Sequence, residues 1–272
     1  MRTDALVRSA VANIRVEPDQ RSELFSQALL GHAVEIEEER GRWLHCRFDE
    51  GSRGWIQQGS LALIGKDNAL FTSEEPIIAR TLIARCQSQP MPGAETLMIV
   101  TDGSRLIRVG GDGEWAEVLL PDGTKGWLPS RICLEAGKLP TPSPENVRSL
   151  AKAYMGIPYS WGGTSSLAVD CSGLTQLIFR LHGVLLPRNS FQQAGEGQEL
   201  EVSRNWESLQ AGDLLFFAEK ERIDHMAISI GGASLIHASM SNGCVQRESL
   251  DPGSPQFSSR LSGFFRFARR VT

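Results

Sequence analysis

A spacing that recurs in the first half of the chain places the strongest limit on its fold. Trp43 and Trp55 are 12 residues apart, and Trp115 and Trp127 have the same separation 72 positions further on. The second tryptophan of each pair directly follows a glycine. Self-similarity at a fixed offset is the signature of a repeated structural unit. We therefore expect the first half of the chain to contain two copies of one small unit.

Each copy has the pattern of short β-strands. Residues 42–48, for example, alternate between two sets of side chains, one of them apolar. Short strands at this density predict a small barrel, and we assign the two barrels to residues 1–65 and 66–136. The glycine–tryptophan pairs late in each unit resemble those of bacterial SH3-like domains. Residues 35–39 are rich in glutamate and are followed by arginines, so we interpret them as a solvated turn.

The second half of the chain has a different pattern. Residues 137–144 contain three prolines at alternate positions, which favours an extended linker. From residue 145 apolar side chains recur at helical spacing, and four or five apolar strands follow after residue 212. Helices followed by a run of strands are typical of an α+β domain with an antiparallel sheet. We assign this domain to residues 145–272.

Composition excludes several functions. A net charge of −4 gives no reason to expect nucleic acid or an anionic membrane as a partner. The five cysteines are widely spaced and include no C-x-x-C pair, so we expect neither a metal site nor a disulfide framework, and no cofactor. The chain has no apolar run of membrane-spanning length. Its first residues lack the apolar core of a signal peptide, so we expect a cytoplasmic protein.

One cysteine occupies a position suited to catalysis. Cys171 follows a glycine-rich turn and precedes apolar residues spaced as on one face of a helix: Leu174, Leu177, Ile178 and Leu181. The N–H groups and the positive dipole end of a helix N-terminus favour a thiolate over a thiol. Cys171 is therefore a candidate nucleophile.

Two histidines in the strand region are candidate partners for this cysteine. His225 begins one predicted strand and His237 lies near the end of the next, with Gly231 and Gly232 forming a hairpin turn between them. That turn sets His237 about one residue out of direct register with His225, so a small bulge or twist would bring them into contact. The nearer histidine would take the proton of Cys171, and the farther one would fix its tautomer. Spacing alone leaves an inert cysteine as an equal alternative.

Several sequence blocks together resemble the NlpC-type cell-wall cysteine peptidases. The blocks occur in the family's order at residues 158–163, 170–174, 187–190, 212–217 and 224–228. The resemblance implies a papain-like α+β fold in which Cys171 is the nucleophile, His225 the base and His237 the orienting residue. It also implies that the backbone N–H of Cys171, with Tyr159 nearby, stabilises the oxyanion.

The arrangement of two SH3-like barrels before this domain resembles one subgroup, the γ-D-glutamyl-L-diamino-acid endopeptidases. These cut peptidoglycan stem peptides between γ-D-Glu and the diamino acid and require a free N-terminal L-Ala. The resemblance implies that Asp170, Ser172 and Ser190 hold the substrate's ammonium group. It also makes Glu23 and Trp55 of the first barrel candidates for closing the cleft, although a solvated Glu23 and a core Trp55 fit the sequence equally well. The second barrel would be a spacer.

The sequence therefore predicts a monomeric cytoplasmic hydrolase that trims recycled muropeptides. Its partner would be the stem peptide L-Ala-γ-D-Glu-diamino acid. Two alternatives remain open at this point. One is an exported endopeptidase that acts on intact peptidoglycan, and the other is a catalytically dead SH3-like protein that binds the wall.

Overall fold

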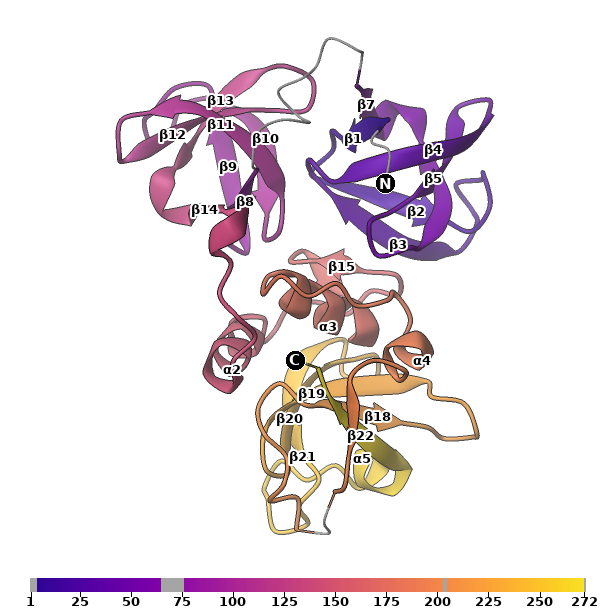
Figure 1. Cartoon of the computed structure of the whole chain (residues 1–272). Coiled ribbons are helices and arrows are strands. Elements are labelled where there is room, and N and C mark those ends of the chain that lie inside the picture. Colours follow the sequence, from indigo (N-terminus) through magenta and orange to yellow (C-terminus); the bar gives the residue numbers. More distant parts are fainter. Residues whose placement is uncertain (1–3, 65–75, 203–204, 272) are drawn as a thin grey trace. The chain divides into compact units, whose positions relative to one another are not determined.

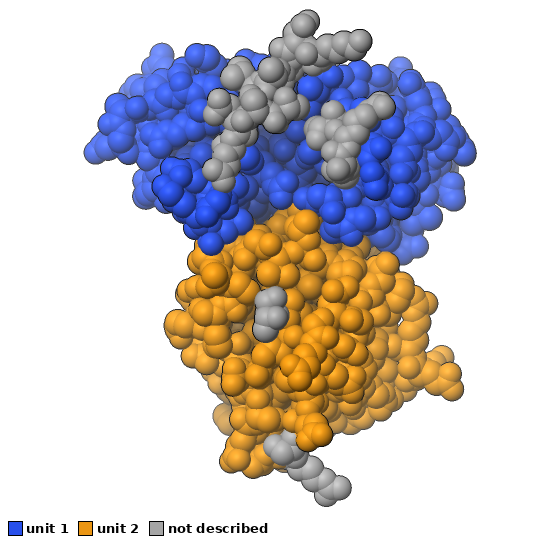
Figure 2. Space-filling model, viewed as in Figure 1, with its two compact units in different colours: residues 1–139, 165–167 blue, residues 140–164, 168–272 orange. Residues whose placement is uncertain are grey.

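The computed structural model describes residues 4–64, 76–202 and 205–271. The chain divides into two compact units, which are described separately (Figure 2). Unit 1 comprises Met1–Leu139 with Ser165–Leu167, and unit 2 comprises Pro140–Thr164 with Ala168–Thr272. The predicted boundary between the two barrels, at residue 65, lies outside the described residues. No helix in the described part of the chain is long and apolar enough to span a membrane.

The first sheet of unit 1 contains seven strands within residues 4–64, in the order β3-β2-β6-β5-β4-β1-β7 (Figure 1). These strands and one short 3-10 helix are β1 (Ala5–Val7), β2 (Val11–Arg15), β3 (Leu24–Leu29), β4 (Ala33–Arg40), β5 (Trp43–Arg47), β6 (Arg53–Gln57), η1 (Gln58–Ser60) and β7 (Leu61–Leu63). Buried aliphatic side chains such as Ile14, Val34 and Ile56 form its core.

The second sheet of unit 1 has the same strand order as the first. Within residues 76–139 the order is β10-β9-β13-β12-β11-β8-β14, in which every strand takes the place of its counterpart seven numbers earlier. The elements are β8 (Ile77–Ala79), β9 (Ile83–Gln87), β10 (Thr96–Thr101), β11 (Arg105–Gly111), β12 (Trp115–Leu119), β13 (Lys125–Pro129), η2 (Ser130–Ile132), β14 (Cys133–Glu135) and η3 (Ala136–Lys138).

The repeated tryptophans occupy equivalent places in the two sheets. Trp43 begins β5 and Trp55 lies in β6, and these two strands pair with each other. Trp115 likewise begins β12, and Trp127 lies in its partner β13. The 72-residue offset in the sequence therefore corresponds to a repeat of one strand topology.

The glutamate-rich segment of the first sheet is a strand and not the predicted turn. It forms the exposed part of β4, which pairs with β5. Glu35 forms an ion pair with Arg47 on the facing strand, and Arg53 Nε lies 2.9 Å from Glu37 Oε1. Cross-strand pairing with opposite charges therefore allows a run of like charges to remain extended. Strand β3 was not predicted from the sequence, and two of its six residues are polar.

Unit 2 combines short helices with a six-stranded antiparallel sheet in the order β17-β22-β18-β19-β20-β21, counted over the residues the structure describes. The helices are α2 (Pro144–Ala153), α3 (Cys171–Arg180), α4 (Ser190–Gln193) and α5 (Ser259–Phe264). The strands are β15 (Thr164–Ser165), β16 (Ala168–Val169), β17 (Gln198–Leu200), β18 (Leu214–Phe217), β19 (His225–Gly231), β20 (Ser234–Ser239), β21 (Cys244–Ser249) and β22 (Phe265–Arg270).

Helix α3 is the central helix of unit 2. Its residues 172–179 are all buried, and it packs against β19 and β20 in the middle of the sheet (Figure 1). Helix α2 begins at Pro144, with the Ser143 side chain accepting a hydrogen bond from Asn146 N. A serine cap followed by proline in the first turn is a standard helix start. This packing brings the first residue of α3 close to the first residues of β19.

Candidate active site

Cys171 is the first residue of α3, as the sequence predicted, and a tight turn fixes its position. The Asp170 side chain caps the helix by accepting a hydrogen bond from Gly173 N at 2.7 Å. A Cβ atom on Gly173 would lie 2.0 Å from the carbonyl oxygen of Gly163, so only glycine fits there. Gly162 has a positive φ of 77°, a conformation that favours glycine. The glycines therefore seat the turn directly against the helix that carries the cysteine.

Asp170 is held by an arginine to which the sequence analysis gave no role. Arg188 Nη1 lies 3.1 Å from Asp170 Oδ1, and Arg188 Nη2 lies 2.5 Å from Asp170 Oδ2. The carboxylate also accepts hydrogen bonds from Gly162 N at 2.9 Å and from Ser172 Oγ at 3.3 Å. Asp170 and Arg188 are both almost completely buried. A carboxylate with this many donors is saturated, and the bidentate pair makes its orientation rigid.

The other two predicted amine-binding residues each follow a member of this pair by two positions in the chain. Ser172 is buried, and its hydroxyl accepts a hydrogen bond from Arg188 Nη1 at 2.9 Å. Ser190 is half-buried at the start of α4. The N-cap of α4 is Asn189, whose backbone N donates to Gln192 Oε1 at 3.2 Å. Arg188 lies in the sequence block at residues 187–190. Its position two residues before Ser190 was the only sequence signal that it belongs to the site.

His225 and His237 are in contact. His225 Nε2 and His237 Nδ1 are 2.8 Å apart, and the ring planes are nearly perpendicular. Strands β19 and β20 pair Ile228 with Ile236, and their register shifts next to the turn, between Ser229 and Gly231. When the Ile228–Ile236 pairing is continued by one residue away from the turn, His237 lies opposite Ala227. The two histidines are then diagonal neighbours on one face of the sheet, within reach of large side chains.

A cavity of about 290 Å³ in unit 2 joins these groups. It is lined by Tyr159, Trp161, Cys171, Phe217, Glu219, Asp224, His225, His237, Ser239, Met240, Ser241, Glu248, Ser258, Arg260, Leu261 and Phe264. Cys171, both histidines and Tyr159 therefore share one space, and Asp170, Ser172 and Ser190 are not among the residues that line it. Cys171 is the first residue of α3, so its backbone N–H belongs to the turn whose N–H groups have no partner inside the helix.

Burial opposes the thiolate form that the sequence predicts for Cys171. Burial is the main cause that raises the pKa of Cys171 to about 12, and the Asp170 charge adds to it. Arg188 and the backbone N–H groups of Met226 and Ser172 oppose this rise. Burial, the neighbouring His237 and Arg260 lower the pKa of His225 to about 3. Desolvation outweighs the helix terminus here, and it opposes charge on both the Cys171 thiol and the His225 imidazole.

The remaining histidines have structural contacts. His32 Nε2 lies 3.2 Å from Gly103 O, His182 Nδ1 lies 2.7 Å from Ile178 O, and His45 Nδ1 lies 3.2 Å from Glu37 Oε2. No cluster of three or more metal-ligating side chains occurs in the part of the chain that the structure describes.

The two candidates in the first sheet have different environments. Glu23 is exposed just before β3. Trp55 is only 5% exposed, its ring centroid lies 5.0 Å from that of His45, and Arg40 stacks over its indole. These contacts are those of a packed barrel residue. The cleft-closing role given to both residues stays a prediction.

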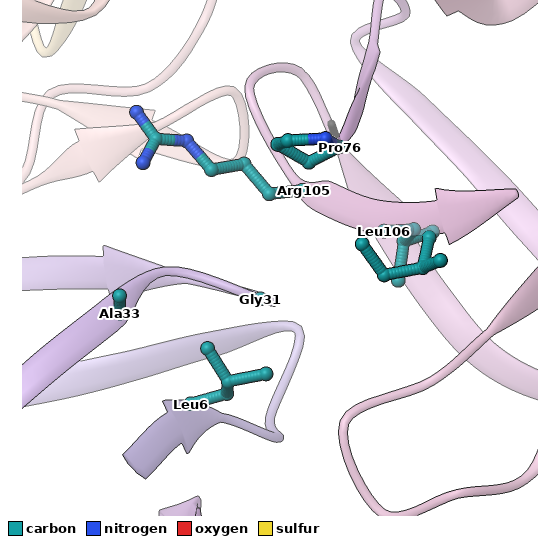
Figure 3. Close-up of a pocket in the computed structure, with 7 residues that line it drawn as sticks. Leu6, Gly31, Ala33, Pro76, Arg105 and Leu106 are labelled. Atoms are coloured by element: carbon teal, nitrogen blue, oxygen red, sulfur yellow. The ribbon is translucent and has the colours of Figure 1, made fainter. Parts of the chain in front are cut away.

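Unit 1 also contains a cavity of about 170 Å³, whose lining includes Leu6, Gly31, Ala33, Pro76, Arg105 and Leu106 (Figure 3). Among the described residues that line it, Arg105 is the only ionisable one, and Arg105 Nη2 lies 3.3 Å from Asp49 Oδ2. These described lining residues include no nucleophile or general base.

A helix-borne thiol that shares a cavity with a histidine pair, in a fold of this type, defines a cysteine peptidase, a class of hydrolase. The chain belongs to the NlpC/P60 family, whose profile matches residues 156–261. The bacterial SH3 domain profile matches residues 9–62. The fold is therefore a papain-like NlpC/P60 domain preceded by an SH3-like β domain.

Named relatives extend over most of the chain. A Bacillus cereus protein named gamma-D-glutamyl-L-lysine dipeptidyl-peptidase is 32% identical over 231 residues, which are 80% of this chain and 68% of the relative. Dipeptidyl-peptidase 6 of Lysinibacillus sphaericus is 29% identical over 95% of this chain and 96% of the relative. The crystal structure of an NlpC/P60 family protein from Bacillus cereus has a TM-score of 0.85 and 25% identity, covering 99% of both chains.

Proposed function

We propose that this protein is an endopeptidase that hydrolyses the bond between γ-D-Glu and the diamino acid in peptidoglycan stem peptides with a free N-terminal L-Ala. The observation that carries the proposal is the cavity shared by Cys171, His225 and His237, with the two imidazoles 2.8 Å apart. The name of the Bacillus cereus relative, gamma-D-glutamyl-L-lysine dipeptidyl-peptidase, supports the choice of substrate, and that of the Lysinibacillus sphaericus relative supports a dipeptidyl-peptidase.

Acylation in this mechanism begins with a neutral pair. His225 takes the proton of the Cys171 thiol while the sulfur attacks the γ-carbonyl carbon of D-Glu. The backbone N–H of Cys171 and the Tyr159 hydroxyl stabilise the oxyanion. Burial raises the pKa of Tyr159, so its hydroxyl keeps the proton that it donates. His225 then protonates the amine of the diamino acid, and the C–N bond breaks.

Deacylation regenerates the enzyme. A water molecule attacks the thioester carbon while His225 accepts one of its protons. The C–S bond breaks, L-Ala-γ-D-Glu leaves, and the proton on His225 returns to Cys171. His237 orients His225 throughout, in the role that the third residue of a catalytic triad has.

We propose that Asp170, Ser172 and Ser190 lie where the substrate's ammonium group binds. An ammonium group in this cluster would meet Arg188 as well as the Asp170 carboxylate. Changing Asp170 would therefore disturb the arginine pair and any bound amine together. The substrate's amine is the better variable for a test.

The repeated topology of unit 1 supports a second SH3-like barrel, formed by β8 to β14, that acts as a spacer. We place the enzyme in recycling of murein peptides in the cytoplasm. The competing assignment, an exported endopeptidase, would act on stem peptides still attached to the wall.

The decisive comparison uses L-Ala-γ-D-Glu-diaminopimelate and its N-acetylated form. A site that holds a free ammonium group should reject the blocked peptide by about 100-fold or more in kcat/KM, because buried polar groups lose their partner. Equal rates on the two peptides, together with release of fragments from purified peptidoglycan, would instead establish the exported lytic enzyme.

The nucleophile is tested with Cys171→Ala. This variant should lose about 10⁴-fold or more in kcat, the scale seen when one member of a triad is removed. It should still bind the tripeptide in calorimetry with an affinity close to that of the wild type. If both proteins bind the peptide and neither cleaves it, the protein is a wall-binding module and the proposed activity is wrong.

A further inference from the structure

We infer that Glu248 is a positioning residue that sets the direction of the hydrogen bonds between His237 and His225, so that His225 Nδ1 is left able to accept the proton of Cys171. The inference rests on the proposed cysteine peptidase function. It adds a fourth residue, at the far end of the chain of polar groups, that the sequence analysis did not identify.

Glu248 lies beside His237 because of the sheet register. Strands β20 and β21 pair His237 with Gln246 and Leu235 with Glu248, so Glu248 is the diagonal neighbour of His237 on the same face. His237 Nε2 and Glu248 Oε2 are 3.3 Å apart. Gln246 Nε2 donates a hydrogen bond to Glu248 Oε1 at 2.8 Å. One carboxylate oxygen is therefore held by Gln246 and the other faces the histidine.

The chemistry of Glu248, His237 and His225 gives the hydrogen bonds among them one direction. An ionised carboxylate can only accept, so the 3.3 Å approach of Glu248 Oε2 favours the tautomer of His237 that carries its proton on Nε2. When His237 is neutral its Nδ1 is bare, and the 2.8 Å contact with His225 then requires the hydrogen on His225 Nε2. His225 Nδ1 consequently has a lone pair. It is the nitrogen left for Cys171, which lines the same cavity.

Burial makes this control effective. The His237 side chain is 4% exposed and that of Glu248 is 21% exposed, so bulk water has little access to the contact between them. Contact with His237 is the largest cause that lowers the pKa of the Glu248 carboxyl, and the Ser258 hydroxyl and Arg260 act in the same direction. The carboxylate therefore remains an ionised acceptor at neutral pH.

Glu248→Gln should reverse the direction of hydrogen-bond donation between His237 and His225. Gln246 donates to the oxygen that faces it, so the new amide presents its oxygen to Gln246 and its NH₂ to His237 Nε2. His237 then carries its proton on Nδ1 and donates to His225 Nε2, which moves the proton of His225 to Nδ1 and blocks the base. We expect kcat to fall by about 100-fold or more, with KM within about threefold, because a wrong tautomer of this kind is costly in triads.

Glu248→Leu provides the contrast. It removes the acceptor without supplying a donor, so the tautomers are unbiased and the loss in kcat should be only about 10-fold, as is typical of an outer supporting residue. A purely structural role predicts the opposite order, because Gln is isosteric with Glu and Leu is not. Glu199→Gln, an exposed residue of β17 paired with Arg269, is the matched control and should keep wild-type kinetics.

Imidazole ¹⁵N NMR measures the tautomers directly. Protein labelled with [¹⁵N]histidine should show Nε2–H tautomers at both His225 and His237, assigned by the loss of each signal in His225→Gln and His237→Gln. Glu248→Gln should convert both to Nδ1–H. Unchanged tautomers in Glu248→Gln, or a Leu variant slower than the Gln variant, would overturn the inference. An inactive wild type with the stated tautomers would contradict the proposed function alone.

Discussion

Two carboxylates near Cys171 have opposite surroundings. Asp170, next to the cysteine in sequence, receives two contacts from Arg188 and further hydrogen bonds from backbone N–H groups and Ser172. Glu248, 77 positions after Cys171, lies beside His237 and accepts a hydrogen bond from Gln246, and the Ser258 hydroxyl also acts on it. Asp170 thus belongs to a rigid, charge-balanced turn. Glu248 faces a group that can hold its proton on either of two nitrogens.

This difference separates two uses of the same chemical group. A carboxylate saturated by fixed donors holds the geometry of the turn, and its removal leaves a buried guanidinium without the charge it faces. A carboxylate that contacts an imidazole selects a tautomer, and its removal changes which nitrogen carries the proton. We therefore expect changes at Asp170 to appear in stability and changes at Glu248 to appear in kcat.

The largest expected effect on stability is that of Asp170→Asn. In this variant the NH₂ of the asparagine side chain faces groups that are themselves hydrogen-bond donors, and the negative charge that faces Arg188 is lost. The free energy of unfolding should therefore fall by about 3–5 kcal/mol. Urea unfolding measures the change. Glu248→Gln should change the same quantity by less than about 1 kcal/mol, since its more exposed carboxylate has fewer donors.

The double variant Asp170→Asn with Arg188→Met is the control for this comparison. Removing the guanidinium together with its partner should recover part of the lost stability, because no uncompensated charge is then buried. Equal destabilisation by Asp170→Asn and Glu248→Gln would show that the two carboxylates have the same structural role and would end the distinction.

A smaller effect should appear in the pH dependence of stability. The pKa of His225 is about 3 in the folded protein against an ordinary value of 6.5, so the unfolded chain binds more protons between these values. His225 therefore favours the folded state above pH 6.5, and this contribution is lost as the pH falls toward 3. The slope it adds is at most about 1.4 kcal/mol per pH unit. His225→Gln should unfold with a flatter profile over this range, and parallel profiles would contradict the low pKa.

The smallest expected effect concerns the rim of the cavity. Arg260 lines the cavity and is one of the causes that lower the pKa of His225. Arg260→Gln should therefore raise that pKa and move the acid limb of the kcat/KM profile to higher pH, by less than about one unit because the cation is exposed and screened. The shift should vanish at high salt. Arg222→Gln, which removes an exposed cation stacked on Phe191, should leave the limb in place.

Much of the architecture followed from local patterns. The 72-residue offset predicted a repeat, and the two sheets share one strand order. The spacing after Cys171 predicted the helix that begins there, and the paired glycines predicted the hairpin between the two histidines. Patterns failed where distant charges decided the structure. The glutamate-rich segment became strand β4, where its glutamates pair with Arg47 of the adjacent strand β5 and with Arg53 of β6, the next strand beyond.

The sequence by itself determined the element that carries the cysteine, the hairpin that carries the histidines and the resemblance to NlpC-type peptidases, because each depends on residues close together in the chain. Only the tertiary structure decided the hairpin register, the pairing of Arg188 with Asp170 and the contact between Glu248 and His237. It also decided that burial raises the pKa of Cys171, since a pKa depends on burial and on charges brought from elsewhere in the chain. Those long-range contacts have no signature in local spacing.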